Sequence, residues 1–162
     1  MAKPKSVDTS TGMFFEEDYL VRTLGRIAHD AEIALTELVA NAWDAGASLV
    51  DITIPPTNEI ALVVQDDGHG MSSMQFKDRW MRLGYNRIKH QGPQVEFPPE
   101  RSDWRRKPYG RNGVGRHGLL CFSDQYNVET WRDGKGARFE VGTQAQVTRG
   151  CPEFCVNGAS VK

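Results

Sequence analysis

The segment 30–45 constrains the fold most strongly, because its residues predict a single helix with two chemically different faces. Glu37, Asn41 and Asp44 follow one another at steps of four and three, which places them on one stripe of an α-helix. The opposite side is apolar and carries Leu35, Leu38, Val39 and Ala42. The segment contains neither lysine nor arginine, whereas an exposed helix normally mixes both signs of charge. Such a helix buries one face and offers oxygens that suit a cation; a polar face in contact with water is the alternative.

Shorter patterns predict the elements on either side of this helix. The length of 162 residues is close to the ~150 expected for one domain, so we expect an N-terminal arm over 1–13 and one domain over 14–162. The predicted elements are helices over 14–27 and 72–84, strands over 50–54 and 60–64 that form a hairpin, and a second hairpin over 126–131 and 137–141. Residues 85–110 are basic and rich in proline, which predicts a long loop, either a functional lid or disordered.

Composition restricts the partners that the chain can attract. It has 20 Lys and Arg residues and 21 Asp and Glu residues, and the formal charge of −1 provides no general attraction for nucleic acids or anionic membranes. A basic stretch over 101–107, built around Trp104, keeps nucleic-acid binding as a separate hypothesis. No apolar run is long enough for a membrane span or a signal peptide, so the expected location is the cytoplasm. The three cysteines are expected to be reduced, because they are too few for a disulfide framework.

A second candidate site lies where an apolar run ends in glycines. The segment 66–71 has the sequence Asp-Asp-Gly-His-Gly-Met and follows the predicted strand 60–64. Glycines let a flat ring approach the backbone, and the carboxylate of Asp66 beside them can accept a hydrogen bond from the exocyclic amine of a base. An ordinary Asp-Gly turn explains the same residues equally well.

The segment 110–118 is the richest in glycine and predicts a site for a polyphosphate. Its glycines let consecutive backbone N–H groups converge on an anion, and a helix that starts there adds its positive end. The side chains that can add positive charge are Arg111, Arg116 and His117.

Other glycine motifs do not account for this segment. Gly113, Gly115 and Gly118 satisfy the dinucleotide fingerprint G-x-G-x-x-G, but basic residues over 104–109 stand where that fingerprint requires an apolar strand, so a Rossmann site is rejected. A protein-kinase glycine loop and a Walker A loop are rejected as well, because their partner residues are absent from the sequence.

Taken in order, the three segments resemble the nucleotide-binding motifs of the GHKL superfamily, which includes the ATPase component of DNA gyrase, heat-shock chaperones, histidine kinases and mismatch-repair ATPases. The segment 37–45 resembles the N-box, 66–71 the first glycine motif and 110–118 the second, and the ATP lid then corresponds to 85–118. The Morc-like and chaperone-like branch is the most similar. The resemblance covers about 14–141 and implies an α+β Bergerat fold, a two-layer α/β sandwich with helices on one face of a mixed, largely antiparallel sheet.

The resemblance also implies a role for each candidate residue. Glu37 is the general base that orients the attacking water, Asn41 gives its amide oxygen to Mg²⁺, and Asp66 accepts the adenine amine. The other residues implied in ATP binding are Asp44, Ala45, Gly70, Met71, Gly110, Asn112, Gly113, Val114, Gly115, Arg116, His117 and Gly118. The implied cofactors are ATP and Mg²⁺, and the implied activity is ATP hydrolysis coupled to lid closure, conformational change or dimerisation.

Two departures from the family pattern leave other functions open. The pair Gly142-Thr143 resembles one that touches the adenine pocket from a late strand, but here it comes early, so the domain is expected to lack its last strands. No second domain supplies the lysine that completes the phosphate site in several relatives, so we expect turnover by this chain to be weak. The alternatives are an ATP-binding regulatory or assembly module without hydrolysis and a histidine-kinase-like phosphotransfer domain. Glu37 favours water as the acceptor, because histidine kinases usually lack a carboxylate at this position.

Overall fold

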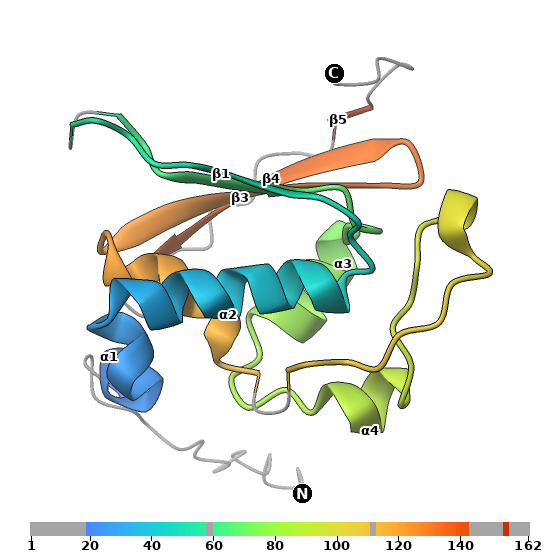
Figure 1. The fold of residues 1–162 in the computed structure, drawn as a ribbon, viewed down its shortest axis with the longest axis horizontal. Helices are drawn as coiled ribbons and strands as arrows, with labels where there is room; N and C mark the ends of the chain where they lie inside the picture. The colour runs from blue at the N-terminus through green and yellow to red at the C-terminus, as the bar shows by residue number, and fades with distance from the viewer. Residues whose placement is uncertain (1–18, 58–59, 111–112, 143–153, 156–162) are drawn as a thin grey trace, which may run out of the picture.

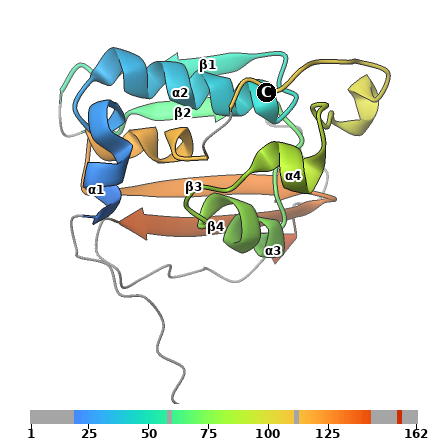
Figure 2. The same ribbon diagram turned by 90° about the horizontal axis from the view of Figure 1, so that it is seen from below.

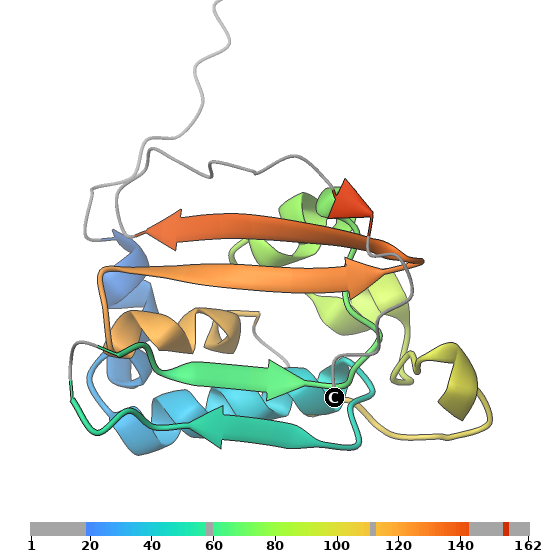
Figure 3. The same cartoon turned by 90° about the horizontal axis from the view of Figure 1, so that it is seen from above.

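The computed structural model of the chain describes residues 19–57, 60–110, 113–142 and 154–155, and its elements form two layers (Figure 1). Helices make up one layer and strands the other, as the views from below (Figure 2) and above (Figure 3) show. The predicted arm over 1–13 lies outside the described residues. In the described part of the chain, no helix combines the length and apolar character needed to cross a membrane.

Helix α2, Ala31–Asp44, confirms the helix predicted over 30–45. The Asp30 side chain caps its start, since Oδ1 accepts hydrogen bonds from the backbone N–H groups of Glu32 and Ile33, both at 3.1 Å. The buried residues of the helix are Ala34, Leu38, Ala40 and Ala42. Leu38 and Ala42 of the predicted apolar face are therefore packed in the molecule, whereas Val39 is 39% exposed and Ala40, on another side of the helix, is buried instead. The polar stripe is left to line a site.

The strand layer consists of two small antiparallel sheets. The first pairs β1 (Val50–Thr53) with β2 (Val63–Asp66), and the second contains β3 (Gln125–Arg132), β4 (Lys135–Gly142) and β5 (Phe154–Cys155) in that order. Asp133 and Gly134 join β3 to β4 with φ angles of 54° and 74°, the backbone that a two-residue type I′ turn requires. Both predicted hairpins are confirmed, although the second strand of the first hairpin is shifted toward its glycine turn.

A single mixed sheet, as the resemblance implied, is not formed by the described residues. In Figure 3, β2 lies beside β3 and points in the same direction, but no ladder of hydrogen bonds joins them within the described ranges. The chain that follows β2 bonds to a side chain of β3 instead, because the Met71 N–H donates to Oγ1 of Thr130 at 2.8 Å. The fold is therefore α+β in character, with a strand layer divided between β2 and β3.

The core lies between β3–β4 and the predicted helix 72–84. Its buried residues are Phe76, Tyr126, Ala137, Phe139 and Val141. Phe76 stacks on Phe139 with 3.8 Å between the ring centroids, which fixes the helix against β4. The observed helix is shorter than predicted: α3 (Ser73–Gln75) continues into a π-helical turn, η2 (Phe76–Trp80), and the chain then turns through Gly84 at a φ of 66°.

Two further segments differ from the sequence predictions. The helix predicted over 14–27 is described only as α1 (Tyr19–Leu24) and the 3₁₀ turn η1 (Gly25–Ala28). The loop predicted over 85–110 contains α4 (Arg87–Gln91) and η3 (Pro99–Arg101). Local caps explain both elements of the loop, because the Asn86 side chain accepts the Lys89 N–H at 2.9 Å and Pro99 occupies the first helical position.

Candidate functional site

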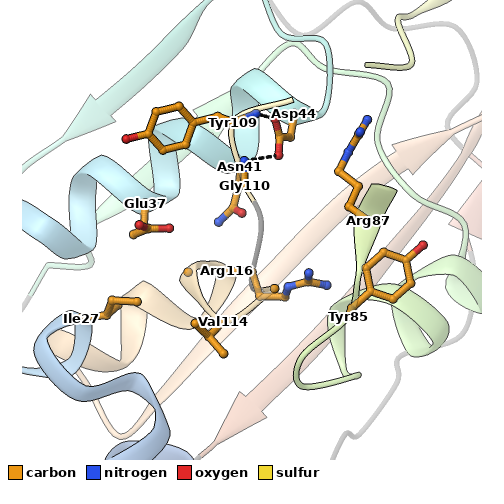
Figure 4. Close-up of a pocket in the computed structure, with 12 residues that line it drawn as sticks. Ile27, Glu37, Asn41, Asp44, Tyr85, Arg87, Tyr109, Gly110, Val114 and Arg116 are labelled. Carbon is orange, nitrogen blue, oxygen red and sulfur yellow. Dashed lines mark hydrogen bonds between the residues drawn. The ribbon is translucent and has the colours of Figure 1, made fainter. Parts of the chain in front are cut away.

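A pocket of about 270 Å³ lies between α2 and the predicted lid (Figure 4). Its lining residues are Ile27, Glu37, Asn41, Asp44, Tyr85, Arg87, Tyr109, Gly110, Gly113, Val114, Gly115 and Arg116. Apart from Ile27, all of these residues belong to α2 or to the predicted lid over 85–118. The structure therefore brings the first and third predicted motifs to one cavity, which we call the α2 pocket.

The polar stripe of α2 forms one wall of the α2 pocket (Figure 4). Asn41 contributes an amide whose Nδ2 atom is buried and has no hydrogen-bond partner in the described part of the chain. Asp44 is bound to the lid, because its carboxylate accepts the backbone N–H groups of Tyr109 at 2.7 Å and of Gly110 at 2.9 Å. Asp44 thus fixes the start of the glycine-rich segment, and the amide nitrogen of Asn41 is left unused by the described residues.

The glycines after residue 112 let the lid approach α2 closely. A Cβ atom at Gly115 would collide with the carboxylate of Glu37, and one at Gly118 would lie 2.9 Å from the carbonyl oxygen of Ala34. The segment then enters the 3₁₀ helix η4 (Gly115–Cys121), with its first residues in the α2 pocket. The glycine-rich segment is therefore packed against α2, whereas Arg111 and Asn112 lie outside the described residues.

His117 does not add the positive charge that its place among the glycines suggested. Its side chain is buried in the core, with Nδ1 2.8 Å from the hydroxyl of Tyr126, which in turn accepts a hydrogen bond from Nε1 of Trp80 at 3.0 Å. Burial, together with the neighbouring charge of Arg116, lowers the pKa of His117 to about 4, so the imidazole is neutral at pH 7. This side chain anchors the glycine-rich segment to β3 and does not line the α2 pocket.

The second predicted motif lies at the C-terminal end of α2, outside the lining of the α2 pocket. The His69 N–H donates to the carbonyl of Ala45 at 2.8 Å, and Gly68 packs directly against Ala45. Oδ1 of Asp66 accepts the Gly68 N–H at 2.8 Å, and surrounding protein atoms desolvate this carboxyl and raise its pKa. Gly68 and His69 of the second motif therefore contact the C-terminal end of α2, at a different place from the glycine-rich segment, whereas Gly70 and Met71 contact β3.

The carboxylate of Asp67 connects several segments of the chain, and no pattern in the sequence indicated these contacts. Its carboxylate accepts hydrogen bonds from the Ser48 N–H and hydroxyl, both at 2.6 Å, from the Leu49 N–H at 2.9 Å and from Nη1 of Arg101 at 2.6 Å. Arg101 also donates to the Asp67 carbonyl at 2.5 Å. Burial acts to raise the pKa of Asp67, but these hydrogen bonds outweigh it and hold the pKa well below its usual range. The lid is thus tied to the residue next to Asp66.

The contacts of Asp67 predict a change in acid stability. In Asp67→Asn the charge is lost, so this variant should be less stable than the wild type at pH 7. Because the folded-state pKa of Asp67 lies below the ~3.9 of an unfolded aspartate, its contribution is present above about pH 4 and is lost as the pH falls further. Urea denaturation from pH 7 to pH 2 should show that the difference in free energy of unfolding between the wild type and Asp67→Asn becomes smaller below about pH 4. A difference in free energy of unfolding that stays constant with pH would contradict a stabilising role for the charged Asp67 carboxylate. Asp51→Asn on β1 is the matched control.

The basic stretch over 101–107 is largely engaged within the molecule. Besides Arg101, the guanidinium of Arg106 lies 4.0 Å from the ring centroid of Trp43 and donates to the carbonyl of Ala47 at 2.8 Å. Trp43 in turn donates its Nε1–H to the carbonyl of Lys107 at 3.0 Å. These contacts dock the lid across the end of α2, which leaves the stretch less free for nucleic acid than its composition suggested.

Four residues that line the α2 pocket were missed in the sequence: Ile27, Tyr85, Arg87 and Tyr109. Tyr85 and Arg87 are 7% and 9% exposed, and both line the pocket from the side opposite α2 (Figure 4). Arg87 donates from Nη2 to the carbonyl of Gln94 at 3.2 Å, and its Nη1 is buried without an acceptor in the described residues. No pattern in the sequence marks Arg87, because Arg82 and Lys89 stand close to it in the chain and only burial distinguishes it from them.

Comparisons with known proteins agree with the arrangement of the motifs. Residues 29–148 match the family model described as "Histidine kinase-, DNA gyrase B-, and HSP90-like ATPase". The chain is also 30% identical over 98 residues to a protein of Herpetosiphon aurantiacus named "Putative type II restriction enzyme HgiDII". This match covers 60% of the chain but only 14% of that protein.

Proposed function

Because the chain belongs to the histidine kinase-, DNA gyrase B- and HSP90-like ATPase family, we propose that it forms a Mg-ATP-binding domain that hydrolyses ATP and couples turnover to movement of its lid. The fold expected for such a domain is the Bergerat fold, and the helix layer over the strand layer is consistent with it. The chain spans a small part of the restriction enzyme that it resembles, so the proposal concerns this domain alone.

One observation carries the proposal: Glu37 and Asn41 of α2 line the same cavity as the glycine-rich segment 113–116. Backbone N–H groups of a glycine-rich turn can hold phosphates, and a carboxylate beside that turn can act on a water next to them. Tyr85 and Arg87 close the other side of the α2 pocket. The cavity therefore has the parts that a phosphate chain and its hydrolytic water need.

The donor set of the α2 pocket fits Mg²⁺. Asn41 offers an amide oxygen, a hard ligand of the kind that Mg²⁺ prefers, and few protein ligands suffice because the ion keeps several waters. The buried Nδ2 of Asn41 has no partner among the described residues, so this amide can turn its oxygen to an ion without breaking a contact. The chemistry that the ion supplies when bound is neutralisation of charge on the phosphate oxygens.

The proposed reaction assigns a proton transfer to Glu37. The water oxygen attacks the terminal phosphorus of ATP, the bond from that phosphorus to the oxygen of ADP breaks, and the Glu37 carboxylate takes the proton of the water. Glu37 touches the backbone at Gly115, so the base is held beside the segment proposed to bind the phosphates. Asp44 keeps Tyr109 and Gly110 in place at the pocket edge.

The proposal gives Asp66 the role of recognising adenine, which can be tested separately from hydrolysis. Asp66→Asn replaces the charged acceptor but keeps an oxygen for the Gly68 N–H, so the fold should be retained. A hydrogen bond to a charged group contributes ~1.5–3 kcal/mol, so we expect calorimetry to show ATP affinity reduced roughly tenfold or more. An unchanged ATP affinity in a folded Asp66→Asn variant would show that Asp66 does not bind adenine. The control is Asp51→Asn, in which ATP affinity should not fall.

An ATP-dependent assembly module without hydrolysis is the alternative function, with a nucleotide-dependent homodimer as its output. This alternative uses the same ATP-binding site as the hydrolase and differs from it only in that Glu37 does not activate a water. Phosphotransfer to a histidine, a third function found in this family, would require a protein acceptor in place of water. Measurement of phosphate release at high protein concentration separates these cases, because only hydrolysis releases phosphate in a Glu37-dependent manner.

A further inference from the structure

The α2 pocket has acidic and amide groups on one wall and two arginines on the facing side (Figure 4). Glu37, Asn41 and Asp44 come from α2, whereas Arg87 and Arg116 come from the lid. None of the ion pairs found among the described residues joins either arginine to Glu37 or Asp44. The positive side of the pocket is therefore not neutralised by direct contact with its negative side.

The two arginines differ in how far the fold uses them. Arg116 donates from Nη1 to the carbonyl of Arg79, and its guanidinium lies 5.4 Å from the ring centroid of Tyr85. Arg87 makes one hydrogen bond, from Nη2 to Gln94, and its Nη1 has no acceptor in the described part of the chain. Arg87 is 9% exposed as a whole, and Nη1 itself is buried. Arg87 therefore holds a buried donor that the described part of the protein leaves unused.

In the absence of a ligand, the unpaired Nη1 of Arg87 makes the folded protein less stable. A buried N–H without an acceptor loses its hydrogen bonds to water, and the cost is larger when the group is charged. Burial lowers the pKa of Arg87, and attraction to Asp44 compensates only in part, although a guanidinium stays protonated in proteins. An anion that enters the α2 pocket would provide the missing charge beside Arg87, and it would provide the missing acceptor once the guanidinium turns Nη1 toward the cavity.

We infer that Arg87 binds the phosphate chain of the nucleotide and makes the α2 pocket select for the number of phosphates. A guanidinium can donate two parallel hydrogen bonds to one phosphate, which gives both affinity and orientation. The inference rests on the proposed function and adds a source of positive charge within this chain. Its position on the lid also means that a phosphate bound by Arg87 would hold the lid against α2.

The test compares nucleotides that differ only in phosphate number. Calorimetry is used to measure binding of ATP, ADP and AMP to the wild type, to Arg87→Met and to Arg87→Lys. We expect Arg87→Met to weaken ATP binding roughly tenfold or more, with a smaller loss for ADP and the smallest for AMP. Arg87→Lys should recover part of the ATP affinity, because it restores the charge but not the paired donors. Arg82→Met, an exposed arginine a few residues earlier, is the matched control.

A purely structural role for Arg87, through its bond to Gln94, would give a different result. Loss of that tether would reduce the affinity for all three nucleotides by the same factor, and would also lower the stability of the protein without nucleotide in urea. Equal losses, or an ATP affinity unchanged in Arg87→Met, would overturn the inference and leave the proposed function intact. Failure of the wild type to bind any of the three nucleotides would instead overturn the proposed function. If Arg87→Met does not fold, the ratio of ATP to AMP affinity in Arg87→Lys decides the matter.

Discussion

Replacement of Glu37 by glutamine is expected to reduce ATP hydrolysis about 10²–10⁴-fold while ATP binding stays within a few fold of the wild type. Glutamine keeps the size of the side chain, so the contact with the backbone at Gly115 should be retained. It cannot take a proton from water, and the chemical step is therefore the one that slows. Phosphate release under single-turnover conditions measures the rate, and calorimetry measures the binding.

The control for this change lies on the same helix. Glu32→Gln removes an equal charge from the exposed first turn of α2 and should leave both rate and affinity near their wild-type values. Glu37-independent phosphate release at the wild-type rate would show that another group activates the water. Absence of release from both wild type and Glu37→Gln, together with normal ATP binding, would favour the assembly module over the hydrolase.

Gly70→Ala should cause the largest loss of stability among single substitutions in the predicted site. Gly70 has a φ of 61°, and a Cβ atom there would collide with the carbonyl oxygen of Trp131 on β3. The left-handed backbone costs an alanine ~1–2 kcal/mol, and overpacking against a fixed backbone adds roughly 1–3 kcal/mol. We therefore expect a total loss of about 2–5 kcal/mol in urea denaturation, a large share of the stability of an ordinary domain.

Gly84 provides the matched comparison for Gly70. Its φ of 66° is nearly the same, but a Cβ atom at this position would meet no atom within 4 Å. Gly84→Ala should therefore show only the ~1–2 kcal/mol cost of the left-handed backbone. Equal losses in the two variants would mean that the segment after β2 does not press against β3 as described. A larger loss at Gly70 would instead identify the collision as the cause.

The elements with strong local signals could be predicted from the sequence. The spacing of the residues over 30–45 was enough to place α2, and the apolar runs over 126–131 and 137–141 were enough to place the β3–β4 hairpin. The order of the three motifs was also enough to identify the family. Each of these elements and motifs consists of residues that are close together in the chain, which is why the sequence alone was enough to predict them.

The features that were missed depend on contacts between distant residues. Arg101 and Asp67 are far apart in sequence, and nothing near either residue indicates that they meet. His117 was predicted to bind phosphate because it stands among glycines, but its side chain is buried in contact with Trp80 and Tyr126. Arg87 could not be distinguished from its basic neighbours until its burial was known.

The stacking of Arg106 on Trp43 gives the molecule an optical signal of its own. The indole of Trp43 is 46% exposed, lies under a cation and is bonded to the chain at Lys107, so its surroundings are set by the lid. If the lid lifts from α2, this indole loses both contacts at once and its fluorescence changes. Because the chain contains four tryptophans, the part of a fluorescence change that is absent in Trp43→Phe would report any movement of the lid on addition of nucleotide.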